Sequence, residues 1–363
     1  MRKRRKRSIA REALCLLAAV LAGLLTGALT AREEPRSEKA SGGLLPLVPE
    51  TAEQNAAASE NAPEGVLQSA TEAAEEEAAE VRLPSDIIRV STAEGVVEME
   101  LEEYVFGVVA GEMSAAAEEE ALKAQAVAAR TFAAKRMTGA HCPKGADICT
   151  DAGCCQAYLS EEELKARWGE SYGSNAARVR AAAEATRGLT VTYNGELINA
   201  LYHASSGPAT ESSEAVFACA LPYLVSVESP ETEAESVSEK LFSAEEAAAL
   251  LSSVFPEAGL GDALCPGDIE ILARTESGRA ERVRVGAGVY SGMEVRMALG
   301  LKSAAFTPCF EADGKVSFTC VGYGHGVGMS QTGANGMAAA GADFREILAH
   351  YYVGTEIARI TYD

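Results

Sequence analysis

The clearest periodic pattern in this chain lies between residues 118 and 136. Leu122, Ala126, Ala129 and Ala133 fall at positions i, i+4, i+7 and i+11, which form one face of an α-helix. Acidic residues occupy the first turn, where the helix dipole favours negative charge. The pattern therefore predicts a long helix that turns one face towards the core.

The segment before this helix, residues 101–111, is apolar and is interrupted by Gly107 and Gly111. Glu112 stands between this segment and the helix, alone among Val, Ala, Gly and Met. A carboxyl group beside apolar residues can have a raised pKa. Two interpretations follow for Glu112: an exposed residue at a strand-to-helix turn, or an acid whose pKa is tuned for chemistry.

Alternating residues and turn signals predict several strands along the rest of the chain. Asn194-Gly195, between two runs rich in strand formers, is a strong hairpin signal, and Ser277-Gly278 marks a second hairpin. Strands and helices do not alternate regularly, so we expect an α+β fold. The predicted strands lie in residues 86–92, 96–101, 189–203, 268–287 and 316–321, and further helices in residues 161–187, 243–254 and 343–352.

The N-terminal region predicts an anchor followed by a tether. Residues 1–11 are rich in Lys and Arg, and Ala13–Ala31 is uncharged and close to the roughly 20 residues that a membrane helix needs. The basic flank should stay in the cytoplasm, which predicts a single-pass membrane protein with its bulk outside; a cleaved signal peptide is the alternative. Residues 32–84 lack aromatic residues and read as a disordered acidic tether. Residues 85–363 are then one globular domain.

Charge narrows the range of partners. The chain has 53 Asp and Glu against 32 Lys and Arg, a net charge of −21. Such an acidic protein is a poor binder of nucleic acid, so we expect no nucleic-acid partner.

Four motifs carry a resemblance to a known family. They are EYVFGVVAGEM with EALKAQAVAARTFAAKR, YHASSGPAT (202–210), LPYLVSV (221–227) and GYGHGVGMSQTGANGMAAAGADFREILAHYYVGTEI (322–357). In content and order they resemble the stage II sporulation protein D family, over about residues 86–363.

The resemblance implies a lytic transglycosylase, which cleaves the MurNAc–GlcNAc bond of peptidoglycan and leaves 1,6-anhydro ends. It implies action on glycan strands stripped of stem peptides, during engulfment in sporulation and together with a peptidoglycan amidase. The family's catalytic acid matches Glu112. The alternative, suggested by related amidase enhancers, is a module that binds glycan and activates an amidase without cutting.

A cysteine-rich loop, residues 141–158, follows the long helix. Thiolates and imidazole clustered in a short loop suit tetrahedral zinc, and four protein ligands would make the site structural. Some members of the resembled family hold zinc here, which implies His141, Cys149, Cys154 and Cys155 as ligands, with Cys142 as the rival fourth ligand. Disulfides are the alternative, because an extracytoplasmic compartment permits them.

Two loops hold the expected substrate-binding residues. A serine-hydrolase reading of YHASSGPAT is disfavoured because the GxSxG elbow is missing. In GYGHGVGMSQ, alternating glycines would leave one strand face bare, for close approach by either a glycan or another part of the chain. The resemblance places both loops along the substrate cleft, and the residues that we expect to contact sugar are Tyr202, His203, Ser205, Ser206, His325, Ser330 and Gln331.

Overall fold

The computed structural model describes residues 79–139, 141–232 and 236–363. Within these ranges helices and strands are mixed without regular alternation, which agrees with the predicted α+β class. The predicted anchor, Ala13–Ala31, lies outside the described residues, as does most of the predicted tether. None of the helices in the described ranges has both the length and the apolar character needed to cross a bilayer.

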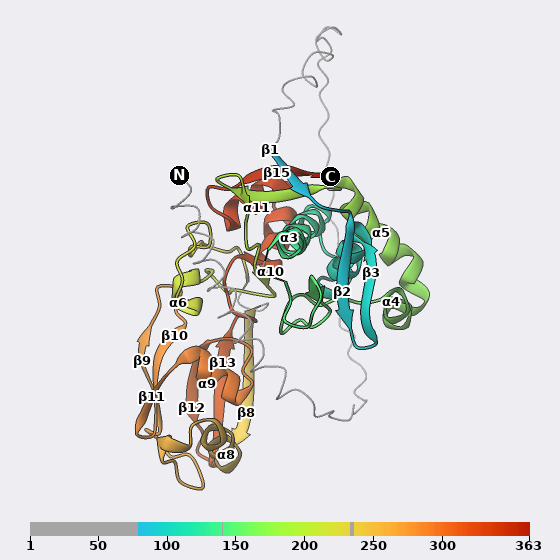
Figure 1. The fold of residues 1–363 in the computed structure, drawn as a ribbon. Coiled ribbons are helices and arrows are strands. Elements are labelled where there is room, and N and C mark those ends of the chain that lie inside the picture. The colour runs from blue at the N-terminus through green and yellow to red at the C-terminus, as the bar shows by residue number, and fades with distance from the viewer. Residues whose placement is uncertain (1–78, 140, 233–235) are drawn as a thin grey trace, which may run out of the picture.

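Helix α3 (Glu119–Thr138) is the centre of the larger part of the molecule (Figure 1). The four residues of its predicted apolar face are fully buried, and so are most others along the helix, because neighbours cover it on nearly every side. These neighbours are α2 (Leu101–Glu112), α5 (Tyr172–Ala185), α10 (Gln331–Ala339), α11 (Phe344–Tyr351) and strand β5 (Leu189–Tyr193).

A buried ion pair ties α3 to α2. The guanidinium of Arg130 is fully buried and donates to both carboxylate oxygens of Glu102, at 2.8 and 2.7 Å. It also donates to the carbonyls of Leu189 and Ala183, at 3.1 and 3.2 Å. Such a bidentate pair is tolerated in a core because its remaining donors are satisfied.

One sheet closes this part of the molecule with strand order β1-β15-β5-β6. Strand β1 (Ala79–Leu83) runs parallel to β15 (Glu356–Tyr362), which is antiparallel to β5. The β5–β6 hairpin, with β6 at Glu196–Leu197, confirms the predicted Asn194-Gly195 turn, where both residues have positive φ. Because β1 lies in residues assigned to the tether, the folded part reaches back at least to Ala79.

Other elements of this part also follow the sequence pattern. The predicted first strand pair is β2 (Ile87–Thr92) with β3 (Gly95–Glu100), extended by β4 (Ile148–Cys149). A short 3-10 turn, Gly169–Ser171, divides the predicted helical region 161–187 into two helices, α4 before the turn and α5 after it. The remaining elements are α4 (Glu161–Trp168), β7 (Tyr202–His203), α6 (Ser213–Phe217) and β14 (Met329–Ser330).

Residues 237–321 build a second lobe with its own core, seen in the lower part of Figure 1. The sequence pattern had not separated this lobe from the rest of residues 85–363. Phe242, Phe306 and Phe318 pack edge to face at its centre. Its elements are β8 (Val237–Ser243), α8 (Ala244–Val254), a 3-10 turn (Pro256–Ala258), β9 (Ile269–Arg274), β10 (Ala280–Val285), β11 (Gly288–Ser291), α9 (Gly292–Leu299), β12 (Ala305–Phe310) and β13 (Lys315–Val321).

The segment before Glu112 differs from the expectation of a turn after a strand, because it is helix α2. Its two glycines, one helical turn apart, let another segment approach. A Cβ on Gly107 would clash with the ring of Tyr158, and one on Gly111 would lie 3.2 Å from the carbonyl oxygen of Ala157. The glycines therefore serve packing, and Glu112 is the last residue of a helix.

Candidate active site

Three neutral groups contact the Glu112 carboxyl. The backbone N–H of Ala157 donates to Oε1 at 2.7 Å, and the Tyr202 hydroxyl donates to the same oxygen at a long 3.5 Å. The Gln331 side-chain amide donates to Oε2 at 3.4 Å. These groups come from the loop after the cysteines, from β7 and from the start of α10. The fold thus brings Tyr202 and Gln331, two of the seven expected substrate residues, to the expected acid.

Burial raises the pKa of Glu112 above its usual range, and the hydrogen bonds from Ala157, Gln331 and Tyr202 oppose that shift. Its place at the C-terminal end of α2 acts in the same direction as burial, because the helix dipole is negative there. Arg167 donates weakly to the carbonyls of Ala110 and Gly111 in that last turn, at 3.4 and 3.5 Å. The carboxyl can therefore hold a proton at a higher pH than an exposed glutamate.

The cysteine loop positions the shortest contact to Glu112. Residues Ala157–Leu159 lie against α2 at its glycines, and the Leu159 N–H donates to the Gly107 carbonyl at 3.2 Å. This packing presents the Ala157 N–H to Glu112. Sequence reasoning missed Ala157, although the i, i+4 glycine pair was a signal that a segment packs there.

A second polar chain reaches Glu112 through the same loop. The Tyr104 hydroxyl donates to Gln156 Oε1 at 3.4 Å, and Gln156 Nε2 donates to the Tyr202 hydroxyl at 2.6 Å. On the other side, Gln331 also donates to Gln125 Oε1 at 3.4 Å. Gln156 and Gln125 are almost fully buried and were not singled out from the sequence. They orient the two side chains that contact Glu112.

The three expected serines lie elsewhere, on a different carboxylate. The hydroxyls of Ser205, Ser206 and Ser330 all donate to Glu231. Burial alone would raise the pKa of Glu231, but hydrogen bonds from Ser205, Ser330 and Ser206 outweigh it and hold the pKa below its usual range. Glu231, which sequence reasoning missed, is therefore ionised near neutral pH.

His203 and His325 form a pair of their own, with ring centroids 5.5 Å apart. Successive residues of a strand point to opposite faces, so His203 turns away from the face on which Tyr202 meets Glu112. Burial, then neighbouring charge, lowers the pKa of His325 to about 4 and that of His203 well below its usual range. Both imidazoles are neutral at pH 7.

The glycine-rich segment is filled by the protein itself. Gly322, Gly324, Gly326 and Gly328 all have positive φ, and a Cβ on each would run into another segment of the chain. The neighbours are, in order, the backbone of Ser205 and Ser206, His203, Arg279 and the backbone of Leu201. Of the two readings of this motif, close packing is the one that the structure shows.

The second lobe contacts the serine loop directly. Arg279, the residue before the lobe's β10, donates to the carbonyls of Ser206 and Ala209, at 3.0 and 3.1 Å. Ser277, from the turn before it, donates to Glu211 Oε2 at 2.6 Å. Residues 206–211 are therefore held on one side by the lobe and on another by Glu231.

Four cysteines gather near the site. The Sγ atoms of Cys142, Cys149, Cys154 and Cys155 all lie within 4.8 Å of one another, and all four thiols are free. The Cys142–Cys154 and Cys154–Cys155 sulfur distances are 3.7 and 3.8 Å. A zinc tetrahedron with Zn–S bonds of about 2.3 Å has edges of about 3.8 Å, so this donor set fits the ion.

The fourth member of this cluster is Cys142, the rival ligand, and His141 lies outside it. The His141 ring is 59% exposed and its Nδ1 is 3.1 Å from Asp147 Oδ1. The backbone of Cys142 forms a bridge with Ala146, and neighbouring residues of extended chain point to opposite sides. This turns Cys142 inwards and His141 outwards.

Hydrogen bonds from Cys154 and Cys155 lower the pKa of the Cys149 thiol to about 2. The thiolate at Cys149 in turn raises the pKa of Cys154 and Cys155. The cluster therefore resists full ionisation by itself, and a bound cation would relieve the repulsion.

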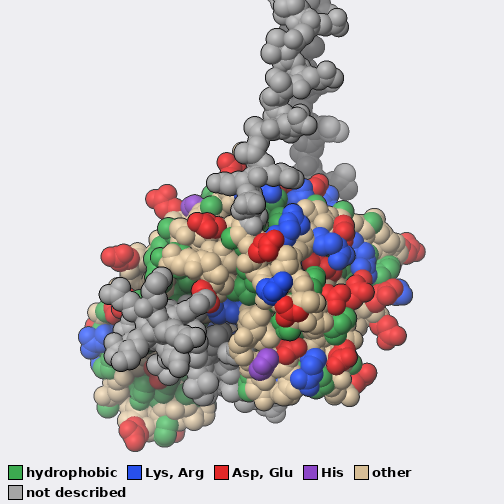
Figure 2. Space-filling model, turned by 45° about the horizontal axis from the view of Figure 1, so that its top comes forward, with side chains coloured by type: hydrophobic (Ala, Val, Ile, Leu, Met, Phe, Trp, Pro, Cys, Tyr) green, Lys and Arg blue, Asp and Glu red, His purple; other side chains and the backbone are tan. Residues whose placement is uncertain are grey.

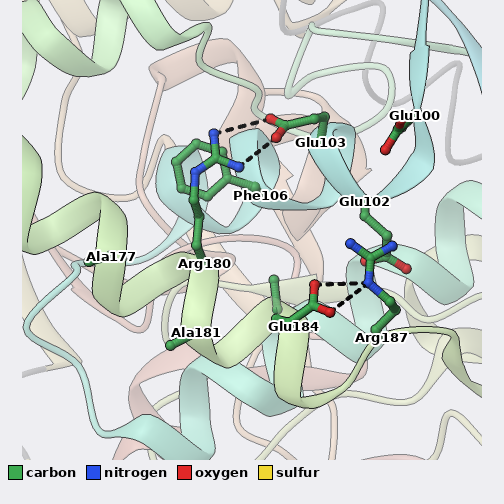
Figure 3. A pocket seen from close by; sticks show the side chains of 10 residues that line it. Glu100, Glu102, Glu103, Phe106, Ala177, Arg180, Ala181, Glu184 and Arg187 are labelled. Atoms are coloured by element: carbon green, nitrogen blue, oxygen red, sulfur yellow. Dashed lines mark hydrogen bonds and ion pairs between the residues drawn. The ribbon is translucent and has the colours of Figure 1, made fainter.

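The surface offers a cavity away from Glu112. Figure 2 shows acidic and basic side chains interspersed over one face of the molecule. A cavity of about 370 Å³ lies between α2 and α5. Figure 3 shows its side chains, among which Arg180 pairs with Glu103 and Arg187 with Glu184. It lies at the N-terminal end of α2, about 15 Å along the helix from Glu112. Because these charges pair with each other, this cavity does not compete with Glu112 as the site of chemistry.

Comparison with known proteins agrees with the motifs. Residues 90–193 match the family model described as stage II sporulation protein. Stage II sporulation protein D of Bacillus amyloliquefaciens is 37% identical over 264 residues, which cover 71% of this chain and 74% of that protein. The protein of the same name from Bacillus subtilis (strain 168) is 37% identical over 270 residues, covering 73% and 76%.

A more distant relative is the amidase enhancer of Bacillus subtilis (strain 168). It is 29% identical over 299 residues, which cover 69% of this chain and 40% of that protein. The likeness to the two sporulation proteins is both higher and spread over most of each chain. This chain therefore belongs to the stage II sporulation protein D family.

Proposed function

We propose that this protein is a lytic transglycosylase that cleaves the MurNAc–GlcNAc bond of peptide-stripped peptidoglycan and leaves 1,6-anhydro ends. Membership of the family, together with the amidase enhancer among its relatives, gives the protein a cell-wall role in sporulation. The specific reaction and its place in septal remodelling during engulfment are our proposal.

The observation that carries the proposal is the environment of Glu112. Its carboxyl is contacted by a peptide N–H, a phenol and an amide, and no cation is among these contacts. Burial raises the pKa of Glu112 above its usual range. A carboxylic acid that holds its proton to a higher pH than an exposed glutamate does is suited to protonate a glycosidic oxygen.

One carboxyl suffices for this reaction. Glu112 donates its proton to the glycosidic oxygen as the bond from that oxygen to C1 of MurNAc breaks. The C6 hydroxyl of the same MurNAc then attacks C1, and its proton passes to the Glu112 carboxylate. The acid is restored, and water does not enter the product. Two-carboxylate glycosidases need their second group for a nucleophile or for activating water, and neither is required here.

The four cysteines would hold a structural zinc ion. Four thiolate ligands leave no open position, so the ion would stabilise the loop and would not bind substrate. The consequence for catalysis would be indirect, because the same loop carries Gln156 and the Ala157 N–H that contacts Glu112. We therefore assign zinc a role in positioning that loop.

The second candidate function is a non-catalytic enhancer of a peptidoglycan amidase, which the amidase enhancer relative favours. Both functions imply denuded glycan strands and a peptidoglycan amidase of the engulfment machinery as partners. Both also place the folded part on the cell-wall side of a membrane, held there by residues 13–31. The two functions differ in what Glu112 does.

The test incubates the purified protein with denuded glycan, and separately with an amidase and intact peptidoglycan. The transglycosylase function predicts new anhydro-muramyl ends from denuded glycan, formed about 10²- to 10⁴-fold more slowly by the Glu112→Gln variant. The enhancer function predicts that the wild type and Glu112→Gln accelerate the amidase equally and that neither produces new glycan ends. Equal acceleration of the amidase without new glycan ends would reject the transglycosylase and favour the enhancer.

A further inference from the structure

The Glu231 carboxylate accepts hydrogen bonds from many hydroxyl and N–H groups. Besides the hydroxyl of Ser205, its partners are the hydroxyl of Ser206 at 2.7 Å and that of Ser330 at 2.5 Å. The Ser229 hydroxyl donates at 3.0 Å. The backbone N–H groups of Ser206 and Gly207 donate at 2.9 and 3.2 Å.

These contacts fill the acceptor capacity of the group. An ionised carboxylate has about four lone-pair sites, and Glu231 receives more donors than that. The serine hydroxyls are thereby committed to Glu231, and Ser205, Ser206 and Ser330 are themselves buried. Contact with sugar, which the sequence suggested for them, would require breaking these bonds. Their present geometry favours a role in holding the chain.

The chain they hold leads directly to Glu112. Ser205 and Ser206 follow Tyr202 in the loop after β7, and Ser330 immediately precedes Gln331. Ser330 is also the N-cap of α10, where its hydroxyl accepts from the Gly333 N–H at 3.2 Å. Strands β7 and β14 pair in parallel over only two residues each. Such a short ladder leaves the relative position of the two loops to other contacts, and Glu231 supplies them.

We propose that Glu231 is a positioning residue for the reaction at Glu112: by binding both serine loops at once, it fixes Tyr202 and Gln331 on the Glu112 carboxyl. This inference rests on the proposed function for the reaction it serves. Its geometric part, the placement of Gln331, stands without it. A shift of about 1 Å in such groups can cost about 100-fold in rate.

The test compares Glu231→Gln with Glu228→Gln in the full-length chain. Both remove one negative charge, but Glu228 is exposed and lies three residues earlier in the same segment. In Glu231→Gln an amide NH₂ faces groups that are themselves donors. We expect kcat on denuded glycan to fall about 10- to 100-fold with KM little changed. We expect Glu228→Gln to match the wild type.

A second readout follows the placement itself. The side-chain amide resonance of Gln331, assigned through its loss in Gln331→Ala, should shift in Glu231→Gln and stay in place in Glu228→Gln. An unshifted resonance in folded Glu231→Gln would overturn the proposal, whatever the rate. So would an unchanged kcat. A wild type that makes no anhydro ends would defeat the proposed function, and the Gln331 resonance would still decide the positioning role.

If Glu231→Gln fails to fold, Ser330→Ala takes its place. This variant keeps the carboxylate and removes its bond to the α10 end of the network, together with the cap bond that Ser330 accepts from the Gly333 N–H. It should shift the Gln331 resonance and lower kcat less than Glu231→Gln would. An unshifted resonance in Ser330→Ala would count against the proposal in the same way.

Discussion

Glu112 and Glu231 are the same chemical group in opposite surroundings. Glu112 has one short hydrogen bond and two long ones, and burial raises its pKa. Glu231 has hydroxyl and N–H donors on both oxygens, and these hydrogen bonds lower its pKa in spite of burial. Deeper burial with fewer donors makes Glu112 an acid that can give up a proton, whereas shallower burial with more donors makes Glu231 an anion that organises its neighbours.

The difference also shows why the expected sugar-binding residues divide into groups. Tyr202 and Gln331 touch the weakly satisfied carboxyl, while the serines saturate the other one. Polar residues close together in a motif can thus serve two different carboxylates. The following predictions test that division.

The largest expected effect is on the reaction itself. Glu112→Gln should lower the rate of cleavage of denuded glycan about 10²- to 10⁴-fold, because an amide cannot act as a general acid. Glu118→Gln, an exposed glutamate beyond the end of α2, is the matched control and should retain full activity. The measurement is the initial rate of release of anhydro-ended fragments. Near-normal activity in Glu112→Gln would remove this residue from the mechanism.

The next effect concerns the cysteine cluster. Cys142→Ser should abolish stoichiometric zinc, measured by elemental analysis, whereas His141→Ala should leave it bound. Loss of the ion costs folding free energy. We therefore expect Tm to fall by about 5–10 °C in Cys142→Ser, since 1 kcal/mol corresponds to about 2–4 °C in a domain of this size. Zinc that is lost in His141→Ala and kept in Cys142→Ser would make His141 the ligand instead of Cys142.

Stability should respond to pH in opposite directions at the two carboxylates. The folded pKa of Glu112 is raised, so its ionisation costs stability as pH rises through the interval between the unfolded and folded values. Glu112→Gln should therefore be more stable than the wild type above that interval and equal to it below.

Glu231 has a lowered folded pKa, so it contributes stability above its unfolded pKa, and that contribution is lost as pH falls. Glu231→Gln should lose about 2 kcal/mol at neutral pH, because hydrogen bonds to a charged group are lost. In acid it should approach the wild type. Denaturant unfolding at several pH values measures the free energy of unfolding of both variants. A change of the same sign in both variants, relative to the wild type, would contradict the comparison.

The smallest effect should be a shift in the pH profile. The Tyr202 hydroxyl opposes the raised pKa of Glu112. Tyr202→Phe should raise that pKa further, so the fall of kcat/KM at alkaline pH moves to higher pH. Tyr323→Phe, an exposed tyrosine in the glycine-rich segment, is the control. A profile of Tyr202→Phe that moves to lower pH would mean that the hydroxyl favours the protonated acid.

Local patterns predicted much of the fold. The periodicity of α3, the Asn194-Gly195 turn and the helix expected in residues 343–352 depend on neighbours in sequence, and the structure agrees with each. Helix α2 was less evident, because glycines lower helix propensity and the segment that they accommodate lies far along the chain. The second lobe has strands of ordinary pattern, and only its separate core distinguishes it.

The candidate site was predictable in its acid and less so in its partners. Glu112 stood out as a lone carboxyl, and the family motifs pointed to it. The Ala157 N–H, Gln156 and Glu231 carry no local signal, since each has a partner at least 26 positions away in the sequence. Cys142 joins the other three cysteines and His141 does not, because the two residues face opposite sides of an extended segment.

The most direct measurement of the central claim is cleavage of denuded glycan in water enriched in ¹⁸O, followed by mass spectrometry of the new ends. If the C6 hydroxyl of MurNAc attacks C1 while Glu112 is the only acid, the new ends are 1,6-anhydro and carry no ¹⁸O. Reducing ends labelled with ¹⁸O would show that water is the nucleophile. Such labelled ends would require a second catalytic group and would contradict a mechanism in which Glu112 is the only catalytic acid.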